Sequence, residues 1–344
     1  MACDIRSMTL PELKGFMETL DEPAYRAAQV FQWLHQKQCT QFSEMTNLSK
    51  GLREKLGETA VLFGCRQVVM QESALDGTRK YLFALSDEEQ IESVLMRYKF
   101  GNSVCISSQA GCRMGCSFCA STLGGLKRNL LPSEMLDQIY AIERALQEPV
   151  NHVVVMGTGE PFDNYANLVR FLRLLTDENG KHLSQRNITV STCGLAPKIR
   201  LFAEEGLKVN LAVSLHAATQ EKREKLMPVA KSWDLSEILD ACRFFFSATG
   251  RRVTFEYSLI AGENDTDRDA EELCRLLHGM NCHVNLIPVN PVTERGYKEP
   301  DRAAVMRFSE LLNKKGVPAT VRREMGRDID GACGQLRARF AAEP

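Results

Sequence analysis

The sequence predicts an α/β protein whose main domain is a partial parallel barrel of six strand–helix units. A small helical domain precedes the barrel, and a hairpin extension joins the two. Two observations lead to this fold class. Short apolar runs alternate with helical patterns after about residue 100, whereas residues 8–75 have helical periodicity. The 344 residues also suffice for one large domain with a smaller appendage.

Residues 1–75 form the predicted helical accessory domain. Its apolar residues recur at helical spacing, for example at Leu10, Leu13, Met17 and Leu20. Residues 76–100 contain two alternating segments, TRKYLFAL and QIESVLMRY, on either side of the acidic turn SDEE. This pattern is typical of a two-stranded β-hairpin.

Residues 101–318 form the predicted barrel, and residues 319–344 are a C-terminal segment. Six apolar runs are expected as strands: SVCIS, HVVVM, NITVS, VNLAVSL, RVTFEYSLI and HVNLIPV. Helical patterns follow most of them, at residues 132–146, 165–175, 235–246 and 267–277. Strands buried on both faces give continuous apolar runs of this kind, as in parallel sheets. A doubly wound sheet would give the same pattern, so the runs alone do not establish closure.

Composition and charge narrow the class of protein. The first twenty residues have no apolar signal-peptide core, and no apolar run reaches the roughly 18 residues that cross a bilayer. We therefore expect a cytoplasmic protein without membrane contact, in which the twelve cysteines are thiols, ligands or catalysts. The net charge of −1 gives no overall field that attracts nucleic acid, so any RNA contact depends on local basic patches such as Arg322, Arg323 and Arg327.

Polar residues and glycines follow the predicted strands where each strand ends. These segments read GTGEP, STCG, SLHA, AGEN and NPV. Chemistry in a parallel barrel is located at the carboxyl ends of its strands, so we expect one shared site there. Gly157 and Gly159 would let a ligand approach the backbone, and Glu160 could accept from an ammonium group. Serine and asparagine at such ends also serve simply as helix caps.

Three cysteines lie within eight positions, at Cys112, Cys116 and Cys119, directly after the first predicted barrel strand. A structural zinc site needs four ligands, and Cys105 could supply the fourth. An iron–sulfur cubane usually takes four cysteines, so three would leave one iron open for a chelating substrate. The amino and carboxylate groups of a methionine suit such a position. Spacing alone leaves both hypotheses open.

The C-x₃-C-x₂-C spacing after a first barrel strand resembles the radical S-adenosylmethionine (SAM) enzymes. Six segments in order further resemble the RlmN type of RNA methylase, over residues 78–340: CISSQAGC, GLKRNL, GEPFDN, SLHA, NLIPVNP and DIDGACGQL. The resemblance implies one 4Fe–4S cluster held by Cys112, Cys116 and Cys119, and SAM as cofactor, with two SAM molecules used per turnover. The residues implied to contact SAM are Gly159, Glu160, Ser191, Ser214, Leu215, His216 and Asn290.

The same resemblance implies roles for three further residues. Cys333 would carry a methyl group, and Cys105 would release the product by forming a disulfide with Cys333. Glu92, by its alternating pattern alone an exposed strand carboxylate, is implied as a base for the proton of the adenine carbon. Cys105 is an alternative base.

The implied reaction is methylation of C2 of adenosine 2503 in 23S rRNA and of adenosine 37 in tRNAs. An electron donor such as flavodoxin or ferredoxin and a monomeric enzyme are expected with it. Methylation at C8 of the same rRNA adenosine, as in related antibiotic-resistance methylases, is an alternative that motif order does not separate from C2. A zinc-stapled RNA-binding protein without catalysis is the non-enzymatic alternative.

Overall fold

The structure is a computed structural model of the chain, and it describes residues 3–290, 292, 294–329 and 336. The N-terminal module is mostly helical, with α1 at Leu10–Thr19, α2 at Tyr25–His35 and α3 at Lys50–Thr59. Two short parallel strands, β1 (Cys3–Asp4) and β2 (Ala60–Val61), join its ends. Helix α1 begins at a capping box, in which the side chain of Thr9 accepts from the Glu12 amide and Glu12 accepts from the Thr9 amide.

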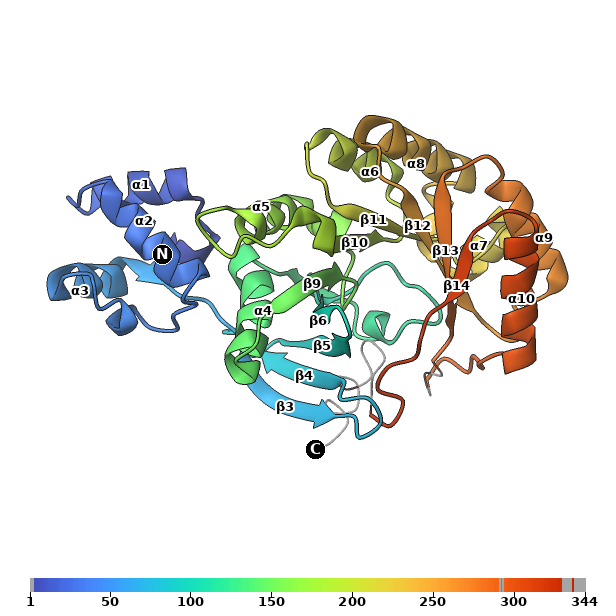
Figure 1. Cartoon of the computed structure of the whole chain (residues 1–344), viewed down its shortest axis with the longest axis horizontal. Coiled ribbons are helices and arrows are strands. Elements are labelled where there is room, and N and C mark those ends of the chain that lie inside the picture. Colours follow the sequence, from blue (N-terminus) through green and yellow to red (C-terminus); the bar gives the residue numbers. More distant parts are fainter. Residues whose placement is uncertain (1–2, 291, 293, 330–335, 337–344) are drawn as a thin grey trace.

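One mixed sheet of ten strands forms the centre of the described chain (Figure 1). Its order is β14-β13-β12-β11-β10-β9-β6-β5-β4-β3, and the strands from β14 to β6 are parallel, whereas β5, β4 and β3 continue the sheet in antiparallel pairs. The strand bounds are β3 Arg66–Glu72, β4 Arg79–Ala84, β5 Gln90–Tyr98, β6 Gly101–Ile106, β9 Val150–Val155, β10 Ile188–Thr192, β11 Asn210–Ser214, β12 Val253–Leu259, β13 Cys282–Pro288 and β14 Ala319–Val321. A separate small sheet pairs β7 (Gln109–Gly111) with β8 (Leu126–Asn129).

Helices cover the outer face of the curved sheet (Figure 1). Their bounds are α4 Pro132–Leu146, α5 Tyr165–Thr176, α6 Ala196–Glu204, α7 Gln220–Leu226, α8 Leu235–Thr249, α9 Asp267–Leu276 and α10 Arg302–Lys314. Helix α8 shows how sequence sets such bounds: an Asp234–Glu237 capping box starts it, and Gly250 ends it in the left-handed conformation at φ 67°. None of the described helices is both long and apolar enough to span a bilayer.

The predicted fold class is confirmed: all six apolar runs are neighbouring parallel strands of a sheet that curves without closing. Three details differ from the expectation. The helices of the N-terminal module end at Thr59, and Arg66–Glu72 form edge strand β3. The predicted hairpin pairs as expected but extends the main sheet. Strand β14 was not predicted, because three residues are too few to show the hydrophobic pattern of a strand. The division of the chain at residues 75, 100 and 318 remains a prediction.

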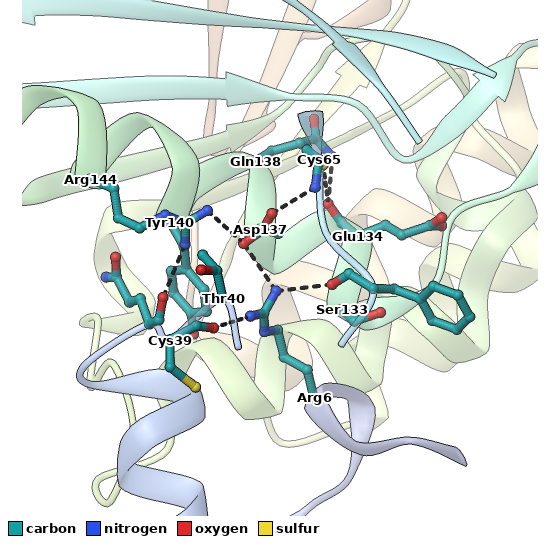
Figure 2. A network of polar contacts seen from close by, with 12 residues as sticks. Arg6, Cys39, Thr40, Cys65, Ser133, Glu134, Asp137, Gln138, Tyr140 and Arg144 are labelled. Atoms are coloured by element: carbon teal, nitrogen blue, oxygen red, sulfur yellow. Dashed lines mark hydrogen bonds and ion pairs between the residues drawn. The ribbon is translucent and has the colours of Figure 1, made fainter. Parts of the chain in front are cut away.

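A buried polar network fixes the N-terminal module against α4 (Figure 2). Arg6 Nη1 donates to Asp137 Oδ1 at 3.0 Å, and Arg6 Nη2 donates to the Cys39 carbonyl at 2.6 Å. Asp137 also accepts from the Cys65 amide at 2.7 Å and from Arg144 at 3.1 Å. Because the Arg6 and Asp137 side chains are only 2% and 3% exposed, the module is held in one orientation by groups that water cannot replace.

Candidate active site

A cavity of about 600 Å³ lies where the parallel strands end, with its wall also formed by residues that follow β14. It brings together most of the residues that the sequence singled out. Those that line it are Cys105, Cys112, Cys116, Cys119, Gly159, Glu160, Ser191, Ser214, His216 and Asn290. Residues more than 180 positions apart therefore share one wall, because the carboxyl ends of parallel strands meet at one edge of the sheet.

The loop that carries the cysteine triplet is held by its own backbone. The Cys112 amide donates to the Gly125 carbonyl at 3.1 Å, and the Ser117 amide donates to the Leu226 carbonyl at 2.8 Å, which ties the loop to the end of α7. Thr122 Oγ1 donates to the Cys119 carbonyl at 2.9 Å. The edge of Phe118 meets the His216 ring, with centroids 4.9 Å apart. The three thiols are thus presented by an ordered turn.

The electrostatic surroundings of the triplet fit a bound positive group. Burial, followed by the nearby Cys119 and Glu160 charges, raises the pKa of Cys112 to about 12. Burial and the two neighbouring thiolates raise the pKa of Cys116 as well. Thiolates so placed need metal ions to compensate their charge, and metal binding deprotonates a coordinating thiol. The chemistry of these donors therefore fits an iron–sulfur cluster.

A buried positive charge close to the triplet also fits an iron–sulfur cluster. Arg223 of α7 is completely buried, and its Nη2 donates to the Cys193 carbonyl at 2.6 Å. Its Nε and Nη1 atoms have no hydrogen-bond partner within the described part of the chain. The positive charge of Arg223 acts on Cys116 and lowers the pKa of that thiol against the larger effect of burial. A negatively charged thiolate–cluster assembly would complement this guanidinium.

The donor geometry also bears on the zinc alternative. Among the described residues, no three His, Cys, Asp or Glu side chains are arranged so that they could hold a single metal ion. A single zinc ion needs such convergence of four ligands. A cubane instead takes thiolates that each bind a different iron, so its ligands need not meet at one point.

The GTGEP turn packs against the residues that follow β6. A Cβ atom on Gly159, whose φ is 108°, would lie 2.6 Å from Gln109 Cβ, and one on Gly157 would lie 2.7 Å from the Ile106 carbonyl oxygen. Both glycines are thus required by close backbone packing, which differs from the ligand approach that the sequence suggested. The Glu160 amide donates to Gln109 Oε1 at 2.8 Å, so Gln109 also sets the position of Glu160.

The Glu160 carboxylate is buried and partly satisfied. Its Oε1 accepts from the Phe162 amide at 2.9 Å, and its Oε2 accepts from the Cys193 amide at 2.7 Å. Burial raises its pKa, while those two amides oppose the shift. The side chains of Cys193 and Thr192 also hydrogen-bond to this carboxylate. Glu160 therefore presents a buried negative charge, held in place by its neighbours, that a cationic ligand group in the cavity would complement.

His216 is held as a neutral imidazole. Its Nδ1 accepts from the Ser258 amide at 2.9 Å, and burial, followed by the charge of Arg223, lowers its pKa to about 3. The neutral ring therefore carries its proton on Nε2 and offers that donor toward its surroundings. Its backbone has a positive φ of 58°, and Asn264 Nδ2 donates to its carbonyl at 2.7 Å.

Two predicted site residues stand apart from this wall. Leu215 is fully buried in the core, and its amide donates to the Glu256 carbonyl at 2.9 Å; neither Leu215 nor Glu92 lines the cavity. Glu92 is also not the exposed carboxylate that its pattern indicated, because it is 3% exposed and lies 3.1 Å from Lys80 Nζ. Strand alternation cannot distinguish a solvated face from a face covered by another segment. Cys333 lies outside the described residues.

Sequence reasoning missed Gln109, Arg223 and Lys80. Arg223 occurs in QEKREKL, whose charges are typical of a solvated helix, and Lys80 lies in the expected hairpin. Of these three, only Gln109 could have been identified from the sequence, because it lies in CISSQAGC, one of the segments that carry the family resemblance. Of the expected basic pairs, Arg322 and Arg323 line the cavity together with Arg327.

Two family models match the chain. The ribosomal RNA large subunit methyltransferase N-terminal domain matches residues 3–62, and the radical SAM superfamily matches residues 106–277. The first coincides with the helical module and the second with the strands and helices that build the cavity. The two family models therefore match the N-terminal helical module and most of the parallel part of the sheet.

Full-length relatives and a solved structure extend the likeness. A probable dual-specificity RNA methyltransferase RlmN from Lachnospira eligens is 55% identical over 337 residues, covering 98% of this chain and 96% of the relative. A protein of the same name from Bacillus thuringiensis is 51% identical over 342 residues, covering 98% and 94%. The crystal structure of a radical SAM methyltransferase from Sphaerobacter thermophilus has a TM-score of 0.93 at 43% identity and covers 97% of this chain and 98% of its own.

Proposed function

Because the chain belongs to the RlmN family of radical SAM RNA methyltransferases, we propose that it methylates C2 of adenosine 2503 in 23S rRNA and of adenosine 37 in tRNAs. The name of the relatives, dual-specificity RNA methyltransferase, supports two classes of RNA substrate. The observation that carries the proposal is the shared cavity, which collects the cysteine triplet, the Gly159–Glu160 turn and His216.

Cys112, Cys116 and Cys119 would hold three irons of a 4Fe–4S cluster and leave the fourth iron open. When bound and reduced by a donor such as flavodoxin or ferredoxin, the cluster supplies the electron that splits SAM into methionine and a 5′-deoxyadenosyl radical. Glu160 would accept from the ammonium group of the methionine part, and His216 Nε2–H would donate to a polar group of SAM. Ser191, Ser214 and Asn290 add polar groups to the same wall.

Cys333 and Cys105 would carry the methyl group and release the product. Cys333 sulfur accepts the methyl group of one SAM, and S-adenosylhomocysteine leaves; a second SAM then gives the radical that activates this methyl group for addition to the adenine carbon. When the Cys105 thiolate attacks the Cys333 sulfur, the sulfur–carbon bond breaks as the disulfide forms. The freed carbon takes up a proton to become the methyl group, and the unpaired electron of the adduct passes back to the one-electron carrier. Cys105 lines the cavity, which supports this role. Of the two candidate bases for the proton of the adenine carbon, Cys105 is the better one, because Glu92 does not line the cavity and pairs with Lys80.

The RNA would meet the cavity at its basic rim. Arg322, Arg323 and Arg327 line the cavity and extend to its edge, and Arg323 and Arg327 are exposed. Arg327 pairs with Glu299 at 3.5 Å and also with Glu324, so Arg322 and Arg323 are the better phosphate contacts. We propose that the enzyme acts as a monomer and that its N-terminal module provides further RNA contacts.

Digestion of treated RNA to nucleosides, followed by chromatography and mass spectrometry, tests this function. The anaerobically prepared enzyme should contain iron and sulfide without stoichiometric zinc, and should yield 2-methyladenosine from both an rRNA fragment and a tRNA. Cys333→Ala should yield none while its iron content stays normal. Formation of 8-methyladenosine would favour the alternative site of methylation, and a zinc-bound protein without methylation would favour the RNA-binding alternative.

A further inference from the structure

Three lysine or arginine side chains are fully buried in the described part of the chain, and two of them have a carboxylate partner. Arg6 pairs with Asp137 at 3.0 Å, and Lys80 lies 3.1 Å from Glu92. The third, Arg223 on α7, forms no ion pair with any described residue. Arginine keeps its charge in proteins, and a buried charge without a counter-charge is costly. A negative group close to Arg223 would therefore be strongly stabilised.

Hydrogen bonds and packing fix where the Arg223 charge lies. Its Nη2 atom donates to the Cys193 carbonyl at 2.6 Å and to the Ser214 carbonyl at 3.4 Å. A Cβ atom on Gly194 would lie 3.1 Å from Nη2, so this loop packs directly against the guanidinium. Cys193 and Ser214 both line the cavity, whereas Arg223 does not. The guanidinium therefore lies just behind the wall that the ends of β10 and β11 form.

Helix α7 also holds the loop that carries the cysteine triplet. The Leu226 carbonyl, three residues after Arg223, accepts from the Ser117 amide at 2.8 Å and from the Ser117 hydroxyl at 3.2 Å. Ser117 lies between Cys116 and Cys119, so less than one turn of helix separates Arg223 from the residue that binds this loop. Burial raises the pKa of Cys116, and the charge of Arg223 opposes that shift. One helix thus places both the charge and the thiols.

We propose that Arg223 is the counter-charge of the cluster held by Cys112, Cys116 and Cys119, and that it raises the reduction potential of this cluster. The inference rests on the proposed function, which places a 4Fe–4S cluster on those three thiolates. Net charge near such a cluster is one of the factors that set its potential. Reduction adds one negative charge, so a fixed positive charge stabilises the reduced form more than the oxidised form.

The burial of Arg223 sets the size of the expected effect. Its side chain is 0% exposed, so water does not surround the charge and screens it little. At an effective dielectric constant of about 20, two unit charges about 10 Å apart interact strongly enough to change an equilibrium constant about tenfold. Removal of the charge should therefore make the cluster at least tenfold harder to reduce.

A redox titration measures this effect without RNA and without methylation. The anaerobic enzyme with its assembled cluster is titrated with dithionite in the presence of redox mediators, and electron paramagnetic resonance follows the single electron that each cluster takes up. SAM is left out, so that its cleavage consumes no electrons. Arg223→Met should lower the equilibrium constant of reduction at least tenfold, which lowers the midpoint potential by about 59 mV or more.

Three further variants separate charge from shape and hydrogen bonding. Arg223→Gln keeps a donor for the Cys193 carbonyl but has no charge, so its potential should fall as in Arg223→Met. Arg223→Lys keeps the charge, so its reduction constant should stay within about threefold of the wild type. Lys225→Met is the matched control on the same helix. The Lys225 side chain is 63% exposed and pairs with Glu263, so its removal should also change the constant less than about threefold.

Each outcome decides between these roles. Equal potentials of the wild type and Arg223→Gln would overturn the proposal, as would an equal fall in Arg223→Gln and Arg223→Lys, because the charge would then not be the cause. If both uncharged variants fail to hold the cluster, Arg223→Lys must retain it, or the proposal fails. A wild-type protein that binds zinc and no iron would overturn the proposed function as well, whereas a normal cluster with equal potentials in all variants would overturn only the role of Arg223.

Discussion

Arg6 Nη1 and Asp137 Oδ1 lie 3.0 Å apart across 131 positions of sequence, and both side chains are almost completely buried. The pair joins the N-terminal module to α4, the helix between the strands β6 and β9 that border the cavity. Loss of Arg6 would leave the buried Asp137 with only the more exposed Arg144 as counter-charge, and would remove the donor of the Cys39 carbonyl. Breaking a buried ion pair in this way is strongly destabilising.

Arg6→Met should therefore lower the free energy of unfolding by about 3–5 kcal/mol. Denaturant titration checks this, and hydrogen exchange should locate the loss in residues 3–62. Arg170→Gln is the matched control, because Arg170 also bridges to the module, through the exposed Glu12 carboxylate at 2.6 Å. That change should cost less than about 1 kcal/mol. Similar losses in the two variants would contradict the special role of the buried pair.

Cys116→Ala should abolish cluster binding, because two thiolates cannot hold the cubane in the way that three do. Iron and sulfide analysis of anaerobically reconstituted protein, with the visible absorption spectrum, measures the loss. Cys274→Ala is the control, since Cys274 is a buried thiol of α9 outside the cavity. Full iron content and normal release of 5′-deoxyadenosine by Cys116→Ala would refute the assignment of this ligand.

Gly159→Ala should disturb the cavity wall that we propose binds SAM. A Cβ atom would lie 2.6 Å from Gln109 Cβ at a backbone φ of 108°, so Gln109 and the Glu160 turn must move apart. We expect a loss of about 2–3 kcal/mol in stability and at least tenfold weaker SAM binding, measured by calorimetry. Gly206→Ala has a positive φ of 71° but no atom within 4 Å of the new Cβ, and should cost only about 1 kcal/mol. Equal SAM affinity in both variants would contradict the packing argument.

Cys105→Ala should keep its cluster but accumulate a covalent protein–RNA adduct at Cys333, because no second thiol remains to accept the Cys333 sulfur. Denaturing gel electrophoresis followed by mass spectrometry detects the adduct. The double variant with Cys333→Ala should show none. Normal multiple turnover by Cys105→Ala would exclude its proposed role, and loss of iron would revive Cys105 as a cluster ligand.

Acid should destabilise the protein through buried histidines. Burial, followed by the charge of Arg6, lowers the pKa of His35 to about 3 from its usual 6.5. Between these values the unfolded chain binds a proton that the folded protein does not, so the histidine's contribution is complete above pH 6.5 and is lost as the pH falls toward 3. From pH 7 to pH 5 this amounts to about 2 kcal/mol.

Denaturant titrations of the wild type and His35→Gln at both pH values test this prediction. Glutamine can still bond to the Tyr140 hydroxyl, which lies 3.1 Å from His35 Nδ1. The variant should therefore lose about 2 kcal/mol less than the wild type on acidification. Equal losses would mean that His35 does not take up a proton on unfolding in this range.

The sequence by itself determined the parallel sheet and the place of the site. A strand that is apolar on both faces is buried most readily inside a parallel sheet with both faces covered, so the six apolar runs became neighbouring strands. The residues that follow them therefore met at one edge of the sheet. The spacing of the cysteines is local, so it too was readable from the chain. Its resemblance to a known family supplied the chemistry that spacing alone left open between zinc and iron.

Only the tertiary structure decided which charged residues are buried and which distant segments touch. Glu92, Lys80 and Arg223 lie in segments with the pattern of exposed elements, yet other parts of the chain cover them. The hydrogen bond from Ser73 to Asp328 joins residues 255 positions apart, and neither local sequence signals it. Burial and long-range contact depend on what packs against a segment, and that information is spread over the whole chain, whereas periodicity records only one element at a time.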